Sequence, residues 1–310
     1  MHDGSRKAII AAFFANLGIA IAKFVGFLVT RSAGLLAEAG HSLADTGNQA
    51  LLMFGSKRGK RPADAAHPFG YGPERYFWAF VVALVLFSMG GLFALYEGIS
   101  KLQHPHVVDN AIVAYVILIV AIGLETFSLR TAVKESNAVR PAGQSWWQFI
   151  RTAKIPELPV VLLEDIGAEI GLVFALGGLT LSEITGNPRW DAAGSIAIGV
   201  LLVVIAIILA IEMKGLLIGE SASDETQAAI SRSIADSPSV NQVIHLKTMH
   251  MSPDDLIVAV KVDFDHSFDA AQIAQAIDDA EARLRAAVPA AKSVYIEPDI
   301  LRSTKPAAGG

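Results

Sequence analysis

The sequence predicts a membrane protein in which a six-helix transmembrane bundle precedes a small C-terminal cytoplasmic α+β domain. Residues 1–218 contain six apolar segments, each close to the about 20 residues that a spanning helix needs. The residues that follow show the hydrophobic periodicity of amphipathic helices and strands. We therefore expect a transmembrane domain at 1–218, a cytoplasmic domain at 219–301 and a disordered tail at 302–310.

Composition supports a membrane protein. Of the 310 residues, 53 % are hydrophobic and 18 % are charged, whereas charged residues make up about 25 % of a soluble domain. The absence of cysteine excludes disulfides and thiolate metal sites. No basic cluster indicates a nucleic-acid partner. Arg6 and Lys7 precede an apolar run that is too long for a signal peptide, so we expect the first segment to remain as a membrane helix.

The order of elements follows from the hydrophobic pattern. The apolar segments are read at about 8–29, 33–55, 77–100, 110–133, 158–181 and 192–214. Basic residues concentrate at the N-terminus and in every second loop, which predicts that both termini lie in the cytoplasm. The C-terminal domain is read as a helix at 224–237, strands at 243–251 and 256–264, a helix at 270–287 and a strand at 293–296. This α-β-β-α-β order predicts an α+β fold.

The second apolar segment contains ionisable side chains in its middle. His41 and Asp45 are four residues apart, which places them on one helix face about one turn apart. A carboxylate at mid-membrane costs about 2.5–3.5 kcal/mol, and an imidazole and a carboxylate can ligate one divalent cation together. The alternative is a polar seam that hydrogen-bonds to neighbouring helices.

The fifth segment carries three carboxylates, Glu164, Asp165 and Glu169. Measured from Val161 at about 100° per residue, Asp165 lies about 40° to one side, and Glu164 lies about 60° to the other. We expect Asp165 to complete a nitrogen and oxygen site with the two residues of the second segment. Glu164, Glu169 and water are candidates for the fourth ligand. The alternative for these carboxylates is an ion pair with a basic residue, Lys23 or Arg130.

Two further groups outside the apolar segments are weaker candidates. Asp64 and His67 lie in the loop after a basic run and could hold a second cation. Alternatively, Asp64 caps a turn and His67 packs against aromatic rings. The C-terminal domain has His245 on or beside its first strand, and Glu297 and Asp299 after its third. They could hold a metal, or they could form an ordinary solvated surface.

These motifs together resemble the cation diffusion facilitator family. The resemblance covers nearly the whole chain. It rests on the His-x-x-x-Asp pattern within Ala39–Gln49, on His67–Gly72, on Leu216–Ala222 and on the C-terminal α-β-β-α-β order. Leu163-Glu-Asp165 resembles the branch that includes the mitochondrial zinc-transporter-like members.

The resemblance implies a homodimer that exports divalent transition metals, usually zinc, from the cytoplasm in exchange for protons. It implies no enzyme activity and no prosthetic group, the metal being the substrate and a candidate regulator, and it suggests a bacterial inner membrane. It assigns His41, Asp45 and Asp165 as transport ligands, and places Asp64, His67, His245, Glu297 and Asp299 at or near regulatory metal positions. Manganese, iron(II) or cobalt export, a channel and a membrane-anchored sensor remain alternatives.

The sequence departs from the family pattern at three positions. Val161 stands where many members have a fourth ligand, so we expect Glu164 to replace it and Glu169 to accept protons. Tyr71 stands where a third loop histidine is frequent, and Lys261 stands at a frequent histidine position of the cytoplasmic domain. The regulatory sites are therefore expected to be incomplete.

Overall fold

The computed structural model describes residues 3–105, 108 and 110–301. Contacts divide the chain into two compact units, one of 1–59 with 74–214 and one of 60–73 with 215–310. The loop at 60–73 thus packs with the C-terminal residues, although we expected it within the membrane domain. The division at residues 218 and 219 stays a prediction. The tail at 302–310 lies outside the described residues.

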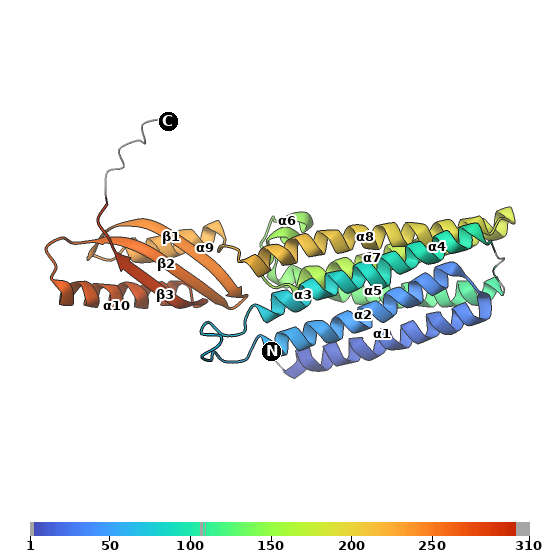
Figure 1. Cartoon of the computed structure of the whole chain (residues 1–310), viewed down its shortest axis with the longest axis horizontal. Helices are drawn as coiled ribbons and strands as arrows, with labels where there is room; N and C mark the ends of the chain where they lie inside the picture. Colours follow the sequence, from blue (N-terminus) through green and yellow to red (C-terminus); the bar gives the residue numbers. More distant parts are fainter. Residues whose placement is uncertain (1–2, 106–107, 109, 302–310) are drawn as a thin grey trace, which may run out of the picture. The chain divides into compact units, whose positions relative to one another are not determined.

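The first unit is a bundle of six long helical segments that lie side by side (Figure 1), as predicted. They are α1 (Asp3–Thr30), α2 (Ala33–Arg58), the α3–η1–α4 segment (Glu74–Gln103), α5 (Ala111–Val139), α7 (Glu157–Thr185) and α8 (Arg189–Ile218). By length and composition, Glu74–Gln103, α5 and α8 are apolar enough to cross a membrane, and Asn16–Thr30 is a shorter apolar helix. Both α2 and α7 carry buried ionisable side chains.

A turn of two residues joins α1 to α2 and makes them antiparallel neighbours. Arg31 adopts φ 56°, in the left-handed region, and its carbonyl accepts a hydrogen bond from the Lys101 ammonium at 2.8 Å. Ser32 caps α2 by accepting from the Leu35 amide. Its hydroxyl also donates to Asp191 at 3.0 Å. The fixed turn brings residues of α1 against the part of α2 that carries the predicted site.

The third spanning segment is not a single α-helix. It consists of α3 (Glu74–Val85), a π-helical stretch η1 (Leu86–Leu92) and α4 (Phe93–Gln103). Gly91 lies within η1, and a Cβ added there would come within 2.7 Å of Val203 on α8. The stretch therefore coincides with a close approach of two helix backbones. Apolar periodicity alone does not distinguish a π-helical stretch from a continuous helix.

The connection between the fourth and fifth spanning segments contains more helix than expected. The fourth apolar segment ends near residue 133, but α5 continues through polar residues to Val139. A short helix, α6 (Trp146–Thr152), follows the N-cap residue Ser145, whose side chain accepts from the Gln148 amide. Hydropathy marks the apolar part of a helix and not its end. Arg6 and Lys7 likewise lie within α1 and do not precede it.

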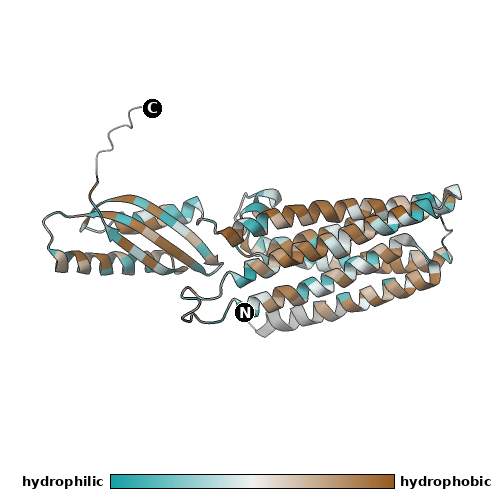
Figure 2. Ribbon diagram, viewed as in Figure 1, coloured by the Kyte–Doolittle hydropathy of each residue, from teal (hydrophilic) through white to brown (hydrophobic). Residues whose placement is uncertain are grey.

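The second unit has the predicted α-β-β-α-β order. Its elements are α9 (Asp224–Ala235), β1 (Val240–Ser252), β2 (Asp255–Phe264), α10 (Ala270–Ala287) and β3 (Ala291–Pro298). The sheet order is β1-β2-β3, with β1 antiparallel and β3 parallel to the central β2. Alternate residues of β2 pack with residues of α9 and α10 in one hydrophobic core. Figure 2 shows the matching alternation of hydrophobic and hydrophilic bands along the strands.

Candidate metal centre

His41 and Asp45 lie together inside the helical bundle, as their spacing predicts. The His41 side chain is fully buried, and Asp45 is only 6 % exposed. The His41 Nδ1 atom lies 3.5 Å from Asp45 Oδ1, within ion-pair range. Neither ring nitrogen of His41 has a hydrogen-bond partner, and neither does Asp45 Oδ1. A buried polar atom without a partner costs about 1–3 kcal/mol, so this pair has ligand atoms to offer to a cation.

Further buried atoms of α2 and α7 also have no hydrogen-bond partner. They are all acceptor oxygens, namely Glu38 Oε1, Asn48 Oδ1, Gln49 Oε1 and Glu169 Oε2. An excess of buried acceptors over donors is relieved by a proton or by a cation. The buried faces of α2 and α7 are therefore suited to positive charge.

Glu164, Asp165 and Glu169, the three carboxylates expected in the fifth apolar segment, lie on α7, and each accepts a hydrogen bond from a polar side chain of a neighbouring helix. The Ser128 hydroxyl of α5 donates to Asp165 Oδ2 at 3.0 Å. The Asn48 amide of α2 donates to Glu164 Oε1 at 2.6 Å. The Thr126 hydroxyl of α5 donates to Glu169 Oε1 at 2.9 Å. Asp165 is 7 % exposed and Glu164 is 4 % exposed, so both belong to the bundle interior.

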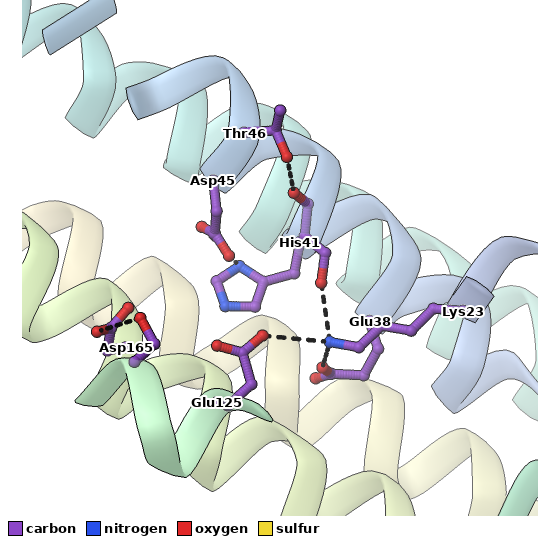
Figure 3. A network of polar contacts seen from close by, with 9 residues as sticks. Lys23, Glu38, His41, Asp45, Thr46, Glu125 and Asp165 are labelled. Atoms are coloured by element: carbon purple, nitrogen blue, oxygen red, sulfur yellow. Dashed lines mark hydrogen bonds and ion pairs between the residues drawn. The ribbon is translucent and has the colours of Figure 1, made fainter. Parts of the chain in front are cut away.

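The predicted ligands share one region of the bundle without being gathered around one point. In the described part of the chain, no three His, Asp or Glu side chains are close enough together to hold one ion. Figure 3 shows His41 and Asp45 adjacent on α2, with Asp165 across the interior from them. The structure thus pairs two of the predicted ligands and leaves Asp165 facing them from α7. The fourth ligand stays a prediction.

The sequence interpretation missed a charged network beside His41. The Lys23 ammonium of α1 donates to Glu38 Oε2 at 3.0 Å and to Ser42 Oγ at 2.8 Å, both on α2. It also lies 3.7 Å from Glu125 Oε1 of α5. From the sequence, Lys23 is a candidate partner only for the carboxylates of the fifth apolar segment. A buried lysine in the first segment and a glutamate in the fourth were the available signals, but their pairing depends on helix packing.

The loop residues adopt the arrangement that we gave as the alternative to a metal site. Asp64 Oδ1 accepts from the backbone amides of Ala66 and His67, and Oδ2 accepts from the Tyr71 hydroxyl at 2.7 Å. The hydrogen bond from Tyr71 and those from the backbone lower the pKa of Asp64. The His67 ring lies 4.2 Å from the Tyr71 ring. Tyr71 thus completes a turn at the position where a histidine ligand is frequent, and metal binding here stays a prediction.

The predicted ligands of the cytoplasmic domain surround a lysine. Strand register places His245 opposite Lys261 and Lys261 beside Glu297. The Lys261 ammonium donates to Glu297 at 2.9 Å and to Asp299 at 3.1 Å. These two hydrogen bonds raise the pKa of Lys261. The ammonium supplies the positive charge that a metal would bring, and metal binding at His245, Glu297 and Asp299 stays a prediction.

Comparison with known proteins identifies the family. Residues 9–218 match the cation efflux transmembrane domain. The chain belongs to the cation efflux family. Residues 222–299 match the cytoplasmic domain of cation efflux proteins. Both matches confirm the predicted family of transporters, which are not enzymes, and the predicted fold.

Individual relatives share between a quarter and a third of their aligned residues with this cation efflux protein. "Proton-coupled zinc antiporter SLC30A9, mitochondrial" from Xenopus laevis is 33 % identical over 84 % of the chain and 47 % of that protein. "Metal tolerance protein C4" from Arabidopsis thaliana is 29 % identical, over 84 % and 57 %. "Metal cation efflux system protein CzcD" from Cupriavidus metallidurans is 25 % identical, over 77 % and 70 %. The chain spans about half the length of the first two.

Proposed function

We propose that this chain exports a divalent transition-metal cation, zinc in the first place, in exchange for protons. The observation that carries the proposal is the buried His41 and Asp45 pair, whose ring nitrogens and Oδ1 atom have no hydrogen-bond partner. Asp165 faces the pair from α7 and supplies a second carboxylate. A relative that is 33 % identical is named a proton-coupled zinc antiporter, which supports zinc and proton coupling.

The proposed mechanism is alternating access around this pair. A cytoplasmic cation binds His41 and Asp45 and draws Asp165 of α7 toward α2. Binding releases protons, because these ligands bind metal only when deprotonated. The helices then rock, and the site opens to the other side. Protons from that side compete with the cation for the same atoms, and the protonated site returns.

The donor set alone does not select zinc. One imidazole among carboxylates also suits manganese, iron(II) and cobalt, and the CzcD relative is named only for metal cation efflux. Transport of Zn²⁺, Mn²⁺, Fe²⁺ and Co²⁺ should therefore be compared in the same proteoliposomes. We expect the highest rate with zinc. A clearly higher rate with another metal would replace zinc in the proposal and leave the export mechanism standing.

The same vesicles separate the transporter from its two rivals. A transporter gives a flux that saturates with metal concentration and responds to a pH gradient. A channel passes current in proportion to the driving force, and a membrane-anchored sensor moves no metal. Channels also favour rings of pore-lining groups, whereas the described interior offers a single histidine and carboxylate pair. We expect saturable flux that depends on the pH gradient.

The homodimer belongs to the same proposal, and the match to the cation efflux cytoplasmic domain supports it. The distribution of basic loops supports cytoplasmic termini. The bacterial inner membrane stays a prediction, because the first relative is named mitochondrial.

We expect removal of residues 220–310 to weaken dimerisation more than it changes metal selectivity. The reason is that the proposed ligands His41, Asp45 and Asp165 all lie in the helical bundle. The measurements are the dimer fraction in detergent and the ratio of zinc flux to manganese flux. A changed ratio in a protein that remains dimeric would contradict this expectation.

A further inference from the structure

The Lys23 ammonium lies in a cage of oxygen atoms beside the proposed transport site. Its nearest neighbours are Ser42 Oγ at 2.8 Å, Glu38 Oε2 at 3.0 Å and Glu125 Oε1 at 3.7 Å. Lys23 and Glu38 are fully buried, and Glu125 is 5 % exposed. Figure 3 shows that these groups come together from three helices, α1, α2 and α5. The cage therefore forms only when the three helices pack together.

The cage has more capacity for positive charge than one ammonium supplies. The carboxylates of Glu38 and Glu125, when both are ionised, carry two negative charges, and Lys23 supplies one positive charge. The second oxygen of Glu38 is buried and accepts no hydrogen bond. That oxygen lies against α7 at Gly171, where an added Cβ would come within 2.6 Å of it. A glycine offers no side-chain donor at that point, so the oxygen remains available to a cation.

The donor chemistry of the cage differs from that of the neighbouring site. Two carboxylates and a hydroxyl form an all-oxygen set, which suits hard divalent cations such as Mn²⁺ and Mg²⁺. The His41 and Asp45 pair includes an imidazole and suits zinc. Metal-to-oxygen distances are about 2.0–2.6 Å, so a divalent ion would draw the cage oxygens inward from their present separations.

We propose that Glu38, Ser42 and Glu125 form a second cation site, which the Lys23 ammonium fills as a tethered monovalent cation. In this arrangement Lys23 keeps Glu125 out of the coordination of the transported ion and limits the helical bundle of each chain to one divalent ion. The limit to one ion rests on the proposed function, whereas the cage itself rests on the contacts of Lys23.

Binding stoichiometry tests this inference in the full-length chain in detergent, with Mn²⁺ as the probe. Titration calorimetry should give one more Mn²⁺ per chain for Lys23→Met, which keeps a side chain of similar length without its charge, than for the parent protein. Lys23→Arg retains the positive charge and should bind the same number as the parent. The double variant Lys23→Met with Glu125→Gln removes a cage ligand and should return to the parent number.

Thermal unfolding of the same samples checks folding and gives a second reading. A cation that binds only the folded state raises its stability, so Mn²⁺ should raise the melting temperature of Lys23→Met more than that of the parent. A folded Lys23→Met protein that binds no more Mn²⁺ than the parent would overturn the inference while leaving the proposed function intact.

Two further outcomes keep the inference separable from the proposed function. If Lys23→Met does not fold, Glu125→Gln in the parent decides. Its Mn²⁺ affinity should stay within about tenfold of the parent value, and a larger loss would make Glu125 a ligand of the transported ion and overturn the inference. If the parent binds neither Mn²⁺ nor Zn²⁺ in the same titration, the proposed function fails. In that case, one Mn²⁺ that is bound by Lys23→Met and lost in the double variant with Glu125→Gln would still support the cage. A Lys23→Met protein that binds no Mn²⁺ would overturn the inference.

Discussion

Replacing Asp45 by asparagine is expected to abolish zinc transport while the protein remains folded. The substitution keeps the size of the side chain and removes the charge beside His41, whose Nδ1 atom lies 3.5 Å from Asp45 Oδ1. Loss of a group that only orients a metal ligand costs about 10–100-fold in affinity, so loss of a ligand should cost at least about 100-fold. The measurement is zinc flux in proteoliposomes, with thermal unfolding as the check on folding.

Thr46→Ala provides the matched control. Thr46 is the next residue of α2 and is also buried, but its hydroxyl donates only to the Ser42 carbonyl of the same helix at 2.8 Å. We expect its flux to stay near that of the parent. Normal zinc flux in a well-folded Asp45→Asn protein would remove Asp45 from the site, and Asp45→Ala should give the same answer as the asparagine variant.

The second large effect is expected at Glu164. An ion held by His41, Asp45 and Asp165 keeps an open coordination position, and Val161 cannot fill it. Glu164 is three residues beyond Val161 and is its neighbour on the helix surface. Asn48 holds Glu164 Oε1 at 2.6 Å, so the other oxygen would meet the ion. We expect Glu164→Gln to weaken zinc binding at least about tenfold, measured by calorimetry in detergent.

Glu169→Gln is the matched comparison, because Glu169 is also a carboxylate of α7 but lies one turn farther along. Thr126 holds Glu169 Oε1 at 2.9 Å. We expect only a mild loss of zinc affinity for this variant. Adding Val161→His to Glu164→Gln should restore part of the affinity. If Glu164→Gln binds zinc like the parent while Glu169→Gln does not, the fourth ligand is Glu169.

Local pattern was enough to predict much of the fold. The helix at 270–287 was predicted with the bounds that α10 has, and the strands were placed within a few residues of their ends. Alternation and helical periodicity are properties of neighbouring residues, so a single sequence displays them. The same reasoning paired His41 with Asp45, because four residues on a helix fix their relation before any packing occurs.

Contacts between helices were beyond this reasoning. The partners of Lys23 are 15, 19 and 102 residues away in the sequence. Which faces of α1, α2 and α5 meet depends on the packing of the whole bundle, and hydropathy marks only that each segment is apolar. For the same reason, the hydrogen bond from Asn48 to Glu164 and that from Ser128 to Asp165 were not foreseen.

The loop at 60–73 shows a different limit. Asp64, His67 and Tyr71 form a turn that is closed by hydrogen bonds to Asp64 and by contact between the His67 and Tyr71 rings. An aspartate and a histidine at short spacing are compatible with both a metal site and a capped turn, so the sequence left both open. The structure differs from a metal site in the hydrogen bond from the Tyr71 hydroxyl to Asp64 Oδ2. The conformation of the turn brings these two groups together, and the spacing of the residues in the sequence does not show it.

The most direct test of the central claim follows zinc and protons in the same proteoliposomes. With zinc outside the vesicles and an acidic vesicle interior, zinc should enter as protons leave. The zinc flux and the proton flux should rise together with zinc concentration and saturate together. Both should be lost together in Asp45→Asn. Zinc entry without proton movement, or full exchange in the Asp45→Asn protein, would contradict the account.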